Sequence, residues 1–388
     1  MRLHSLKYTE YKEEEFSWNL PDLVLGTINL VVGKNATGKS RILRIVIGLS
    51  RLFDGRVLPS ALETGHYIVQ FSDKNNEPFI TYELELYKRK VKSEKLLLKN
   101  ELRLSRGAGG RGRLWFDKVN DFIDVQIPED QLAVTSRRDS EQHSFLEYLH
   151  EWALNSHFVD FASTKPKETF SAIDKATLKQ LRDNQLDDDI VSLFRLGVEK
   201  WGRDFTRQIC ANIRKIGFNV SEIGIQPIQG VPAAIQLLDR AYYIYVVEDG
   251  VKKKLPQYEL SSGMFRAIGA LIRLQSAVAG KKPHCLVIDD IGEGLDFDRS
   301  SRLINLLVSE YELDRNKYSQ LVMTSNDKFV MNGVDIKYWC VVERDGGNIR
   351  TFNQLNSAEI FDDFIQYGFS NFDFFQNGFF SKTIKSSQ

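Results

Sequence analysis

The chain has 388 residues, enough for one large domain or two ordinary ones with a substantial buried core. Hydrophobic residues make up 42% and charged residues 27%, a profile typical of soluble globular proteins. Lys and Arg together number 52, as do Asp and Glu, so no overall positive charge draws the chain to nucleic acid. Any nucleic-acid site must be local.

The cysteines and the N-terminus suggest where the protein works. Cys210, Cys285 and Cys340 are widely spaced and odd in number, so we expect buried thiols and neither disulfides nor a metal cluster. The first residues lack the apolar core of a signal peptide, and no apolar run reaches membrane-spanning length. We expect a cytoplasmic protein with no membrane partner.

The first 32 residues predict a β-meander. Its strands are expected at 3–11, 16–20 and 27–32, with a solvated acidic turn at 12–15. The third strand runs directly into a glycine-containing loop.

That loop, residues 33–40, fits the phosphate-loop pattern G-x-x-x-x-G-K-[ST]. Apolar residues then recur at helical spacing until Asp54-Gly55. Strand, glycine loop and helix start therefore follow in order. Backbone N–H groups in such a loop can wrap a polyphosphate, helped by the positive end of the helix.

The loop offers five candidate nucleotide-binding residues: Gly33, Asn35, Gly38, Lys39 and Ser40. The Lys39 ammonium would reach the β- and γ-phosphates and assist catalysis. The Ser40 hydroxyl would bind Mg²⁺.

Residues 67–104 predict a second β-rich region. Alternation places Ile80, Tyr82, Leu84 and Leu86 on one strand face, with turns expected at 73–76 and 90–94.

A basic, glycine-rich stretch follows at 106–113. Arg106, Arg111 and Arg113 could grip nucleic-acid phosphates. A hairpin turn with solvated arginines explains the same residues, and the neutral surroundings favour that simpler interpretation.

The middle of the chain, 141–216, is expected to be mainly helical. Helices are predicted at 145–152, 176–184 and 190–216, and the aspartates 187–189 form a charge cluster at the start of the last. This segment is too short for two long coiled-coil arms.

Strands are expected again at 220–225 and 235–247, returning to the main sheet, with a turn at 248–250. The aromatic tail, 361–380, is expected to pack onto the domain or a partner.

Two acids follow a buried strand at 285–290. Asp289 and Asp290 end an apolar run, where parallel strands face a ligand crevice. Asp289 could hold Mg²⁺ opposite Ser40, and Asp290 could polarise an attacking water.

Two further stretches complete the pattern. Ser261, Ser262 and Gly263 form a small polar turn that caps a helix and can bind phosphate through its N–H groups. After the acids come Gly294-Leu295-Asp296 and a third apolar strand ending in Thr324-Ser325-Asn326.

In this order, the motifs resemble the ABC-type ATPases of the SMC, RecF and OLD class. The chain looks most like small prokaryotic AAA/ABC-hybrid ATPases without a long coiled coil, many of which occur in phage-defence operons. The resemblance implies an α/β fold: an ABC-ATPase-like P-loop NTPase with an antiparallel β-subdomain and a helical insert. We expect the ATPase lobe in 1–140 and 217–388, with the insert at 141–216.

The resemblance also implies roles for single residues. Ser261, Ser262 and Gly263 match the signature turn that contacts ATP bound to the opposite subunit, so two chains would sandwich two nucleotides. Asp296 matches the D-loop contact. Asp289 would be the Mg²⁺ ligand and Asp290 the catalytic acid.

The chain departs from the family pattern at two positions of the site. Asp290 stands where glutamate is usual, and Asn326 stands where a histidine is usual. Both changes predict slow hydrolysis and favour a nucleotide-gated sensor over a fast motor. Gln70 is the nearest candidate for the lid-loop glutamine.

Three functions remain open. The first is an ATP- and Mg²⁺-dependent ATPase that regulates a separate effector, such as a nuclease or toxin, in antiviral defence. The second is a RecF-like ATPase that clamps DNA during repair. The third is a module that uses ATP structurally to hold an assembly together.

Overall fold

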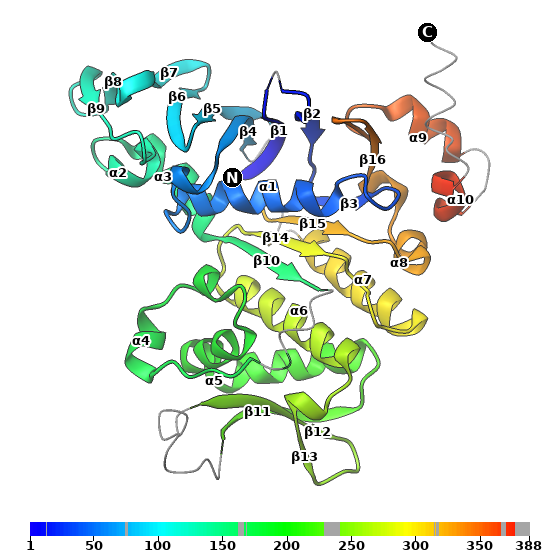
Figure 1. Ribbon diagram of the computed structural model, residues 1–388. Helices are drawn as coiled ribbons and strands as arrows, with labels where there is room; N and C mark the ends of the chain where they lie inside the picture. Colours follow the sequence, from blue (N-terminus) through cyan, green and yellow to red (C-terminus); the bar gives the residue numbers. More distant parts are fainter. Residues whose placement is uncertain are drawn as a thin grey trace.

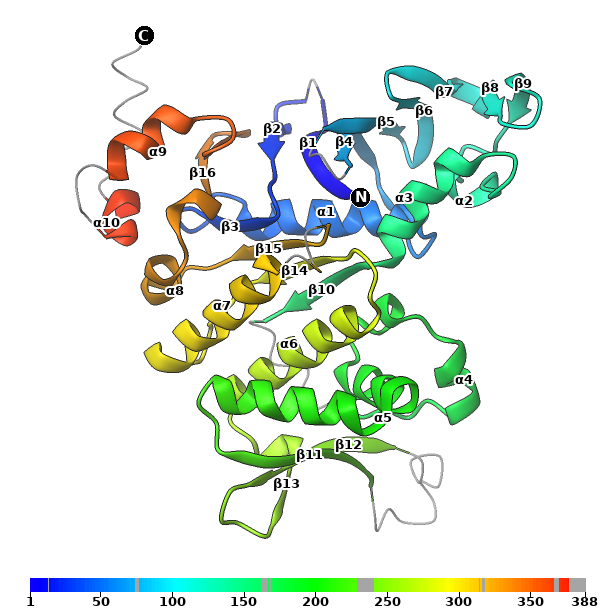
Figure 2. The same ribbon diagram turned by 180° about the vertical axis from the view of Figure 1, so that it is seen from behind.

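The computed structural model describes residues 1–12, 14–73, 77–161, 167, 169–228, 241–313, 315, 318–365 and 370–376. Parts of four predicted segments lie outside these residues: the turn at 12–15, the turn at 73–76, the strand at 235–247 and the aromatic tail at 361–380. Figures 1 and 2 show the described chain as stacked layers.

One large mixed sheet runs through the upper part of the molecule (Figure 1). In spatial order its strands are β10 (Ser156–Asp160), β14 (Cys285–Asp289), β15 (Gln320–Thr324), β3 (Ile28–Val32), β16 (Trp339–Asp345), β17 (Asn348–Asn353), β2 (Trp18–Val24), β1 (Arg2–Glu10), β4 (Thr64–Ser72), β5 (Pro78–Tyr87), β6 (Lys90–Leu98), β7 (Glu101–Arg106), β8 (Arg111–Phe116) and β9 (Asp121–Gln126). The first five strands are parallel.

Helices cover both faces of the parallel strands, with α1 on one side and α6 and α7 on the other (Figures 1 and 2). The helices are α1 (Lys39–Phe53), α2 (Ala133–Ser136), α3 (Ser144–Leu154), α4 (Lys175–Gln180), α5 (Ile190–Lys215), α6 (Ser262–Ala279), α7 (Phe297–Glu312), α8 (Lys328–Gly333), α9 (Ala358–Ile365) and α10 (Asn371–Gln376). Below α5 lies a small sheet of β11 (Val220–Pro227), β12 (Tyr242–Glu248) and β13 (Lys254–Pro256).

Successive side chains of the parallel strands point to opposite faces of the sheet and so belong to two different hydrophobic cores. In β14, Cys285 and Val287 join the core built on α1, while Leu286 and Ile288 join the core built on α5, α6 and α7. Every residue of β14 is buried, as expected for a parallel strand covered on both faces. Strand ends and loops carry the polar groups as a result.

The N-terminal meander prediction is partly wrong. β1 and β2 pair antiparallel as expected, but β16 and β17 separate β2 from β3. Those strands come from the C-terminal part of the chain, so local sequence could not place them. In the second β-region, Ile80, Tyr82, Leu84 and Leu86 are all buried on one face, as predicted.

Two further expectations in this part of the chain need correction. The turn predicted at 90–94 lies inside β6, and the turn residues are Lys88 and Arg89, both with positive φ. The helical middle contains a strand, β10, that pairs in parallel with β14. The helix predicted at 176–184 ends at Gln180 and is followed by a short 3-10 helix, Asp183–Leu186.

The strands after α5 do not return to the main sheet. β11 and β12 pair with each other and with β13 in a separate sheet packed on α5. The boundaries at 140 and 216 remain a prediction. In the tail, Phe361 is buried and Phe372 and Phe375 pack partly against the same core, which confirms packing onto the domain for these three residues.

All three cysteines are free thiols; the predicted burial is confirmed for Cys285 and Cys340, whereas Cys210 is half-buried. None of the helices in the described part of the chain is long and apolar enough to cross a membrane.

Candidate functional site

The glycine loop connects β3 to α1 with a tightly curled backbone. A side chain at Gly33 would begin 2.6 Å from Thr37 Oγ1 and 2.7 Å from the Val342 carbonyl oxygen, so only glycine fits. Gly38, just before α1, has φ 104°, in the left-handed region that favours glycine. Asn35 is exposed on the loop.

Lys39 lies folded against this loop. Its side chain is largely buried, and Nζ donates to the carbonyl oxygens of Gly33 at 2.7 Å and Lys34 at 3.2 Å. Burial lowers the pKa of Lys39, while the charges of Asp290 and Asp289 raise it. Both acids are therefore close enough to interact with the lysine electrostatically.

The carboxyl ends of β14 and β15 meet beside the loop. Thr324 Oγ1 donates to Asp289 Oδ1 at 2.6 Å and accepts from the Asp290 backbone N–H at 2.8 Å. Asn326 Nδ2 donates to Asp290 Oδ1 at 3.2 Å. Four polar residues from the two strand ends thus form one cluster, which includes the predicted site residues Asp289, Asp290 and Asn326.

Asp290 has an unusual backbone and environment. Its φ of 51° is left-handed, a conformation that Asp tolerates better than most residues but that still costs free energy. Burial raises the pKa of the Asp290 carboxyl, the charge of Asp289 raises it further, and Lys39 opposes the change. Neighbouring residues hold this carboxyl in place.

The predicted signature turn is a helix cap. Ser261 Oγ accepts from the Met264 backbone N–H at 3.2 Å, and α6 begins at Ser262. Both serines are exposed. A Cβ on Gly263 would begin 2.2 Å from the carbonyl oxygen of Gly294, so this turn packs directly on the segment after the two acids.

Asp296 begins the next helix. Its side chain accepts from the Arg299 backbone N–H at 3.0 Å and from Arg299 Nη1 at 2.6 Å, and it caps α7. The backbone hydrogen bond to Arg299 is the main reason that the pKa of Asp296 is lowered. The Asp296 side chain is exposed and forms an ion pair with Arg299.

The donor set fits Mg²⁺. Carboxylate and hydroxyl oxygens are the protein ligands that Mg²⁺ accepts, usually one or two beside phosphate and water. The Ser40 hydroxyl and the second oxygen of Asp289 form no hydrogen bond with any described residue. The described residues hold no group of three or more His, Cys, Asp or Glu side chains that could bind a metal without such help from phosphate and water.

Two predicted residues lie away from this cluster. Gln70 is in the middle of β4, where its Oε1 accepts from Ser5 Oγ at 3.0 Å, so the lid-loop prediction is wrong. Arg106 is fully buried and pairs with Glu94 at 2.7 Å, so it does not belong to an exposed basic loop. The hairpin predicted at 106–113 is confirmed, because β7 and β8 pair antiparallel, but only Arg111 and Arg113 are exposed and Arg106 is not a solvated arginine.

Sequence reasoning missed several neighbours of the loop. Trp18 lies 3.4 Å from the position that a Gly38 Cβ would take, and the Arg41 guanidinium stacks over its ring at 4.4 Å. Arg344 Nη1 donates to the Ala36 carbonyl oxygen at 3.3 Å. Asp160 pairs in register with Asp289 and contributes to the raised pKa of Asp290. No local motif marks these contacts, because they come from distant strands.

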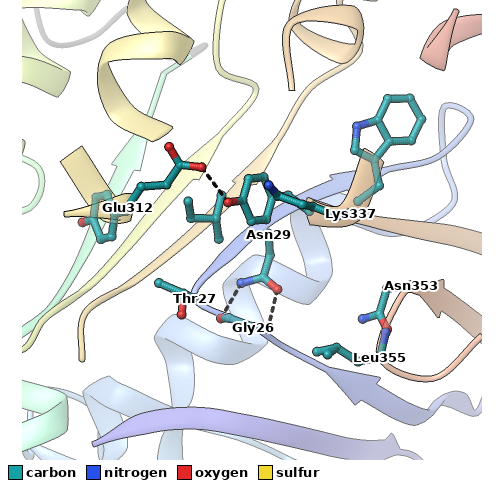
Figure 3. Close-up of a pocket in the computed structure, with 11 residues that line it drawn as sticks. Gly26, Thr27, Asn29, Glu312, Lys337, Asn353 and Leu355 are labelled. Carbon is teal, nitrogen blue, oxygen red and sulfur yellow. Dashed lines mark hydrogen bonds between the residues drawn. The ribbon is translucent and has the colours of Figure 1, made fainter. Parts of the chain in front are cut away.

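Figure 3 shows a cavity elsewhere in the molecule, with a volume of about 410 Å³. In its lining, the Asn29 side chain accepts a hydrogen bond from the Gly26 backbone N–H and donates one to the Gly26 carbonyl oxygen. The Glu312 carboxylate accepts a hydrogen bond from the Tyr338 hydroxyl. The cavity lies where β3 begins, at the opposite edge of the sheet from the glycine loop. None of the predicted site residues lines it.

The strand order, the glycine loop and the acidic strand end define an ABC/SMC-like P-loop ATPase. Sequence comparison matches residues 28–332 to the family described as "AAA domain, putative AbiEii toxin, Type IV TA system". The match covers most of the chain, which therefore belongs to this family. A search of curated proteins gave no match.

One solved structure with a TM-score above 0.5 supports this fold, and two further SMC heads match more weakly. An SMC head bound to the C-winged helix domain of ScpA has a TM-score of 0.51 at 12% identity, over 91% of this chain and 97% of that one. An SMC head domain from Thermotoga maritima has a TM-score of 0.42 at 14% identity, over 91% and 99%. An SMC head domain with an extended coiled coil, bound to the C-terminal domain of ScpA from Pyrococcus furiosus, has a TM-score of 0.45 at 12% identity. That match covers 94% of this chain and 99% of the other.

Proposed function

We propose that the protein binds ATP with Mg²⁺, hydrolyses it slowly, and uses the bound nucleotide to pair two copies of the chain. The observation that carries the proposal is the convergence of Lys39, Asp289 and Asp290 at one edge of the sheet, where Thr324 and Asn326 fix the acids. In P-loop enzymes, catalysis of phosphoryl transfer rests almost entirely on such positioning and charge.

Each residue has a distinct role in this proposal. The loop N–H groups and Lys39 hold the β- and γ-phosphates. Ser40 and Asp289 would ligate Mg²⁺, which neutralises charge on the phosphates. Asp290, held by Asn326, accepts a hydrogen bond from the attacking water and aligns it with the γ-phosphate.

Slow turnover follows from two side chains. Aspartate is one methylene shorter than glutamate, so the Asp290 carboxylate reaches the water less well. The Asn326 amide can donate a hydrogen bond but cannot carry a proton. We infer that the ATP-bound state is long-lived, as suits a sensor.

Pairing of two chains is supported by the signature turn. Ser261 and Ser262 are exposed at the start of a long helix, and Gly263 packs on the segment after the acids. Backbone N–H groups at a helix start favour an anion. The γ-phosphate held by a second copy is the anion that we propose for this position, with Asp296 beside it.

The biological role that we propose is control of a separate effector, such as a nuclease or toxin, in antiviral defence. The family description, which names a toxin of a type IV toxin–antitoxin system, supports this context. A RecF-like DNA clamp is the alternative. The buried ion pair of Arg106 with Glu94 removes one of the three arginines on which that alternative relied.

The test is the mass of the purified protein with and without ATP, measured alongside phosphate release. We expect ATP to pair the native chain, and Asp290→Ala to stay paired without turnover. Lys39→Ala should neither pair nor release phosphate. Mass and phosphate release that are the same in all three proteins would contradict the proposal.

A further inference from the structure

A cluster of buried charges joins the two sides of the molecule around Asp187. This residue lies between the short 3-10 helix and α5, and its side chain is 3% exposed. Three arginines face its carboxylate: Arg273 at 3.5 Å, Arg56 at 3.3 Å and Arg51 at 3.9 Å. Arg51 belongs to α1, and Arg273 belongs to α6.

On one side, the cluster holds the end of the helix that starts at the glycine loop. Asp54 caps the C-terminus of α1, and Arg56 Nε donates to its Oδ2 at 2.7 Å. Asn184 Nδ2 donates to the same oxygen at 2.8 Å. Arg56 also donates to the Asn184 carbonyl oxygen. The end of α1 is therefore tied to the 3-10 helix by several polar contacts.

On the other side, the cluster holds the helix that starts at the signature turn. Arg273 is completely buried, and its Nη1 and Nη2 donate to the carbonyl oxygens of Asp183 at 2.8 Å and Leu186 at 2.7 Å. Ser276, one turn further along α6, donates to the Asp183 carboxylate. The short segment from Asp183 to Asp187 therefore forms hydrogen bonds and ion pairs with both α1 and α6.

The third contact reaches the strand beside the catalytic acids. The Phe158 backbone N–H donates to Asp187 Oδ1 at 3.4 Å, and β10 ends two residues later at Asp160, in register with Asp289. One carboxylate therefore touches elements that lead to the glycine loop, the signature turn and the acidic strand end.

Buried charges are a costly way to join elements. Removing ions from water costs free energy, and well-packed apolar residues often stabilise a fold as well or better. A cavity of about 570 Å³ borders the cluster, lined by Asp187, Arg273, Phe265 and Gly269. Apolar residues of α6 pack in the same core as α5, and on the side that borders the cavity the charge cluster adds polar contacts that also hold α6.

We propose that Asp187 is a positioning residue that sets the orientation of α6 relative to α1, and so presents the signature turn correctly to the nucleotide of a second copy. This inference rests on the proposed function. It goes further by assigning a coupling role to a residue that lies outside the nucleotide site.

The test is Asp187→Asn, which keeps the shape and removes the charge. We expect the affinity of the single chain for ATP to change less than about twofold, and ATP-driven pairing to weaken at least about tenfold, because only pairing needs both helices aligned. The thermal midpoint is measured in parallel. The matched control is Asp204→Asn on α5, which breaks an exposed pair with Arg207 and should leave pairing unchanged.

A second variant covers the case in which Asp187→Asn does not fold. Arg56→Gln removes the contacts of Arg56 with Asp54 and Asp187 and so weakens the α1 side, but it leaves Asp187 paired with Arg273, so the fold is expected to survive. We expect weaker pairing, by about threefold to tenfold, at unchanged ATP affinity. If ATP pairs the native chain and both variants equally well, the inference about Asp187 is wrong, while the proposed function stands. A parallel loss of ATP affinity and pairing would mean a structural role only. No ATP-driven pairing of the native chain would overturn the proposed function.

Discussion

At the scale of single residues, the site depends on a few hydrogen bonds from neighbouring strand ends. Thr324 is fully buried and bonds both to the Asp289 carboxylate and to the Asp290 backbone. Asp290 itself is held in a left-handed conformation. Such a conformation persists where surrounding contacts impose it, and here Thr324 and Asn326 supply them.

Thr324→Val tests this arrangement with a side chain of the same shape. The variant loses both hydrogen bonds, so we expect phosphate release to fall about tenfold and the free energy of unfolding to fall by about 2 kcal/mol. Affinity for ATP alone should change little. Thr324→Ser, which keeps the hydroxyl, is the control. Normal turnover in the valine variant would show that Thr324 does not position the acids.

Asp290→Glu tests the proposal that the short side chain of Asp290 makes hydrolysis slow. The longer side chain restores the reach that is usual in the family, so we expect single-turnover hydrolysis to be about tenfold faster than in the native chain. The measurement is the rate of phosphate formation with enzyme in excess over ATP. Faster hydrolysis by the native chain would contradict the account of Asp290.

At the scale of elements, local sequence predicts the parts that stay within one strand–turn–helix unit. The glycine loop with α1, the Ser261 cap with α6, and β14 with its acids all form as expected. Their signals are local periodicity and capping residues.

Long-range pairing could not be predicted in the same way. β16 and β17 insert between β3 and β2, and the five-residue strand β10 joins the edge of the sheet. The sequence of a short strand does not indicate which other strand it pairs with. The same limit hid Trp18 and Arg344, which reach the glycine loop from other strands.

Gly263→Ala tests the packing of two elements. The added methyl group would begin 2.2 Å from the Gly294 carbonyl oxygen, which must move to make room. We expect ATP-driven pairing to weaken about tenfold, since the signature turn and the D-loop shift together, while single-chain ATP affinity is kept. The control is Gly48→Ala in α1, where the added methyl meets no atom within 4 Å. Unchanged pairing would remove this contact from the account.

At the scale of the whole molecule, buried histidines link folding to pH. Burial, together with the charges of Arg273, His284 and Arg56, holds the pKa of His157 well below its ordinary value of 6.5. The unfolded chain takes up a proton near that pH and the folded chain does not. Stability is therefore greatest above pH 6.5 and falls as the pH drops, by about 1.4 kcal/mol per pH unit for each such group.

His157→Leu should make that dependence shallower. We expect the slope of unfolding free energy against pH, measured by denaturant melts below pH 6.5, to decrease by about 1.4 kcal/mol per unit. Part of the slope should remain, because burial also lowers the pKa of His150 and His284. Identical slopes in the native chain and the variant would show that His157 takes up its proton in the folded state.

The most direct test of the shared nucleotide site mixes two inactive variants. Lys39→Ala lacks a working glycine loop but keeps its signature turn, and Ser262→Arg has the opposite defect. If each site uses the loop of one chain and the turn of the other, neither variant pairs with itself and an equal mixture forms mixed pairs. Each mixed pair has one complete site of two, so the mixture should release phosphate at up to about half the native rate. A mixture no more active than its separate components would contradict the two-chain site.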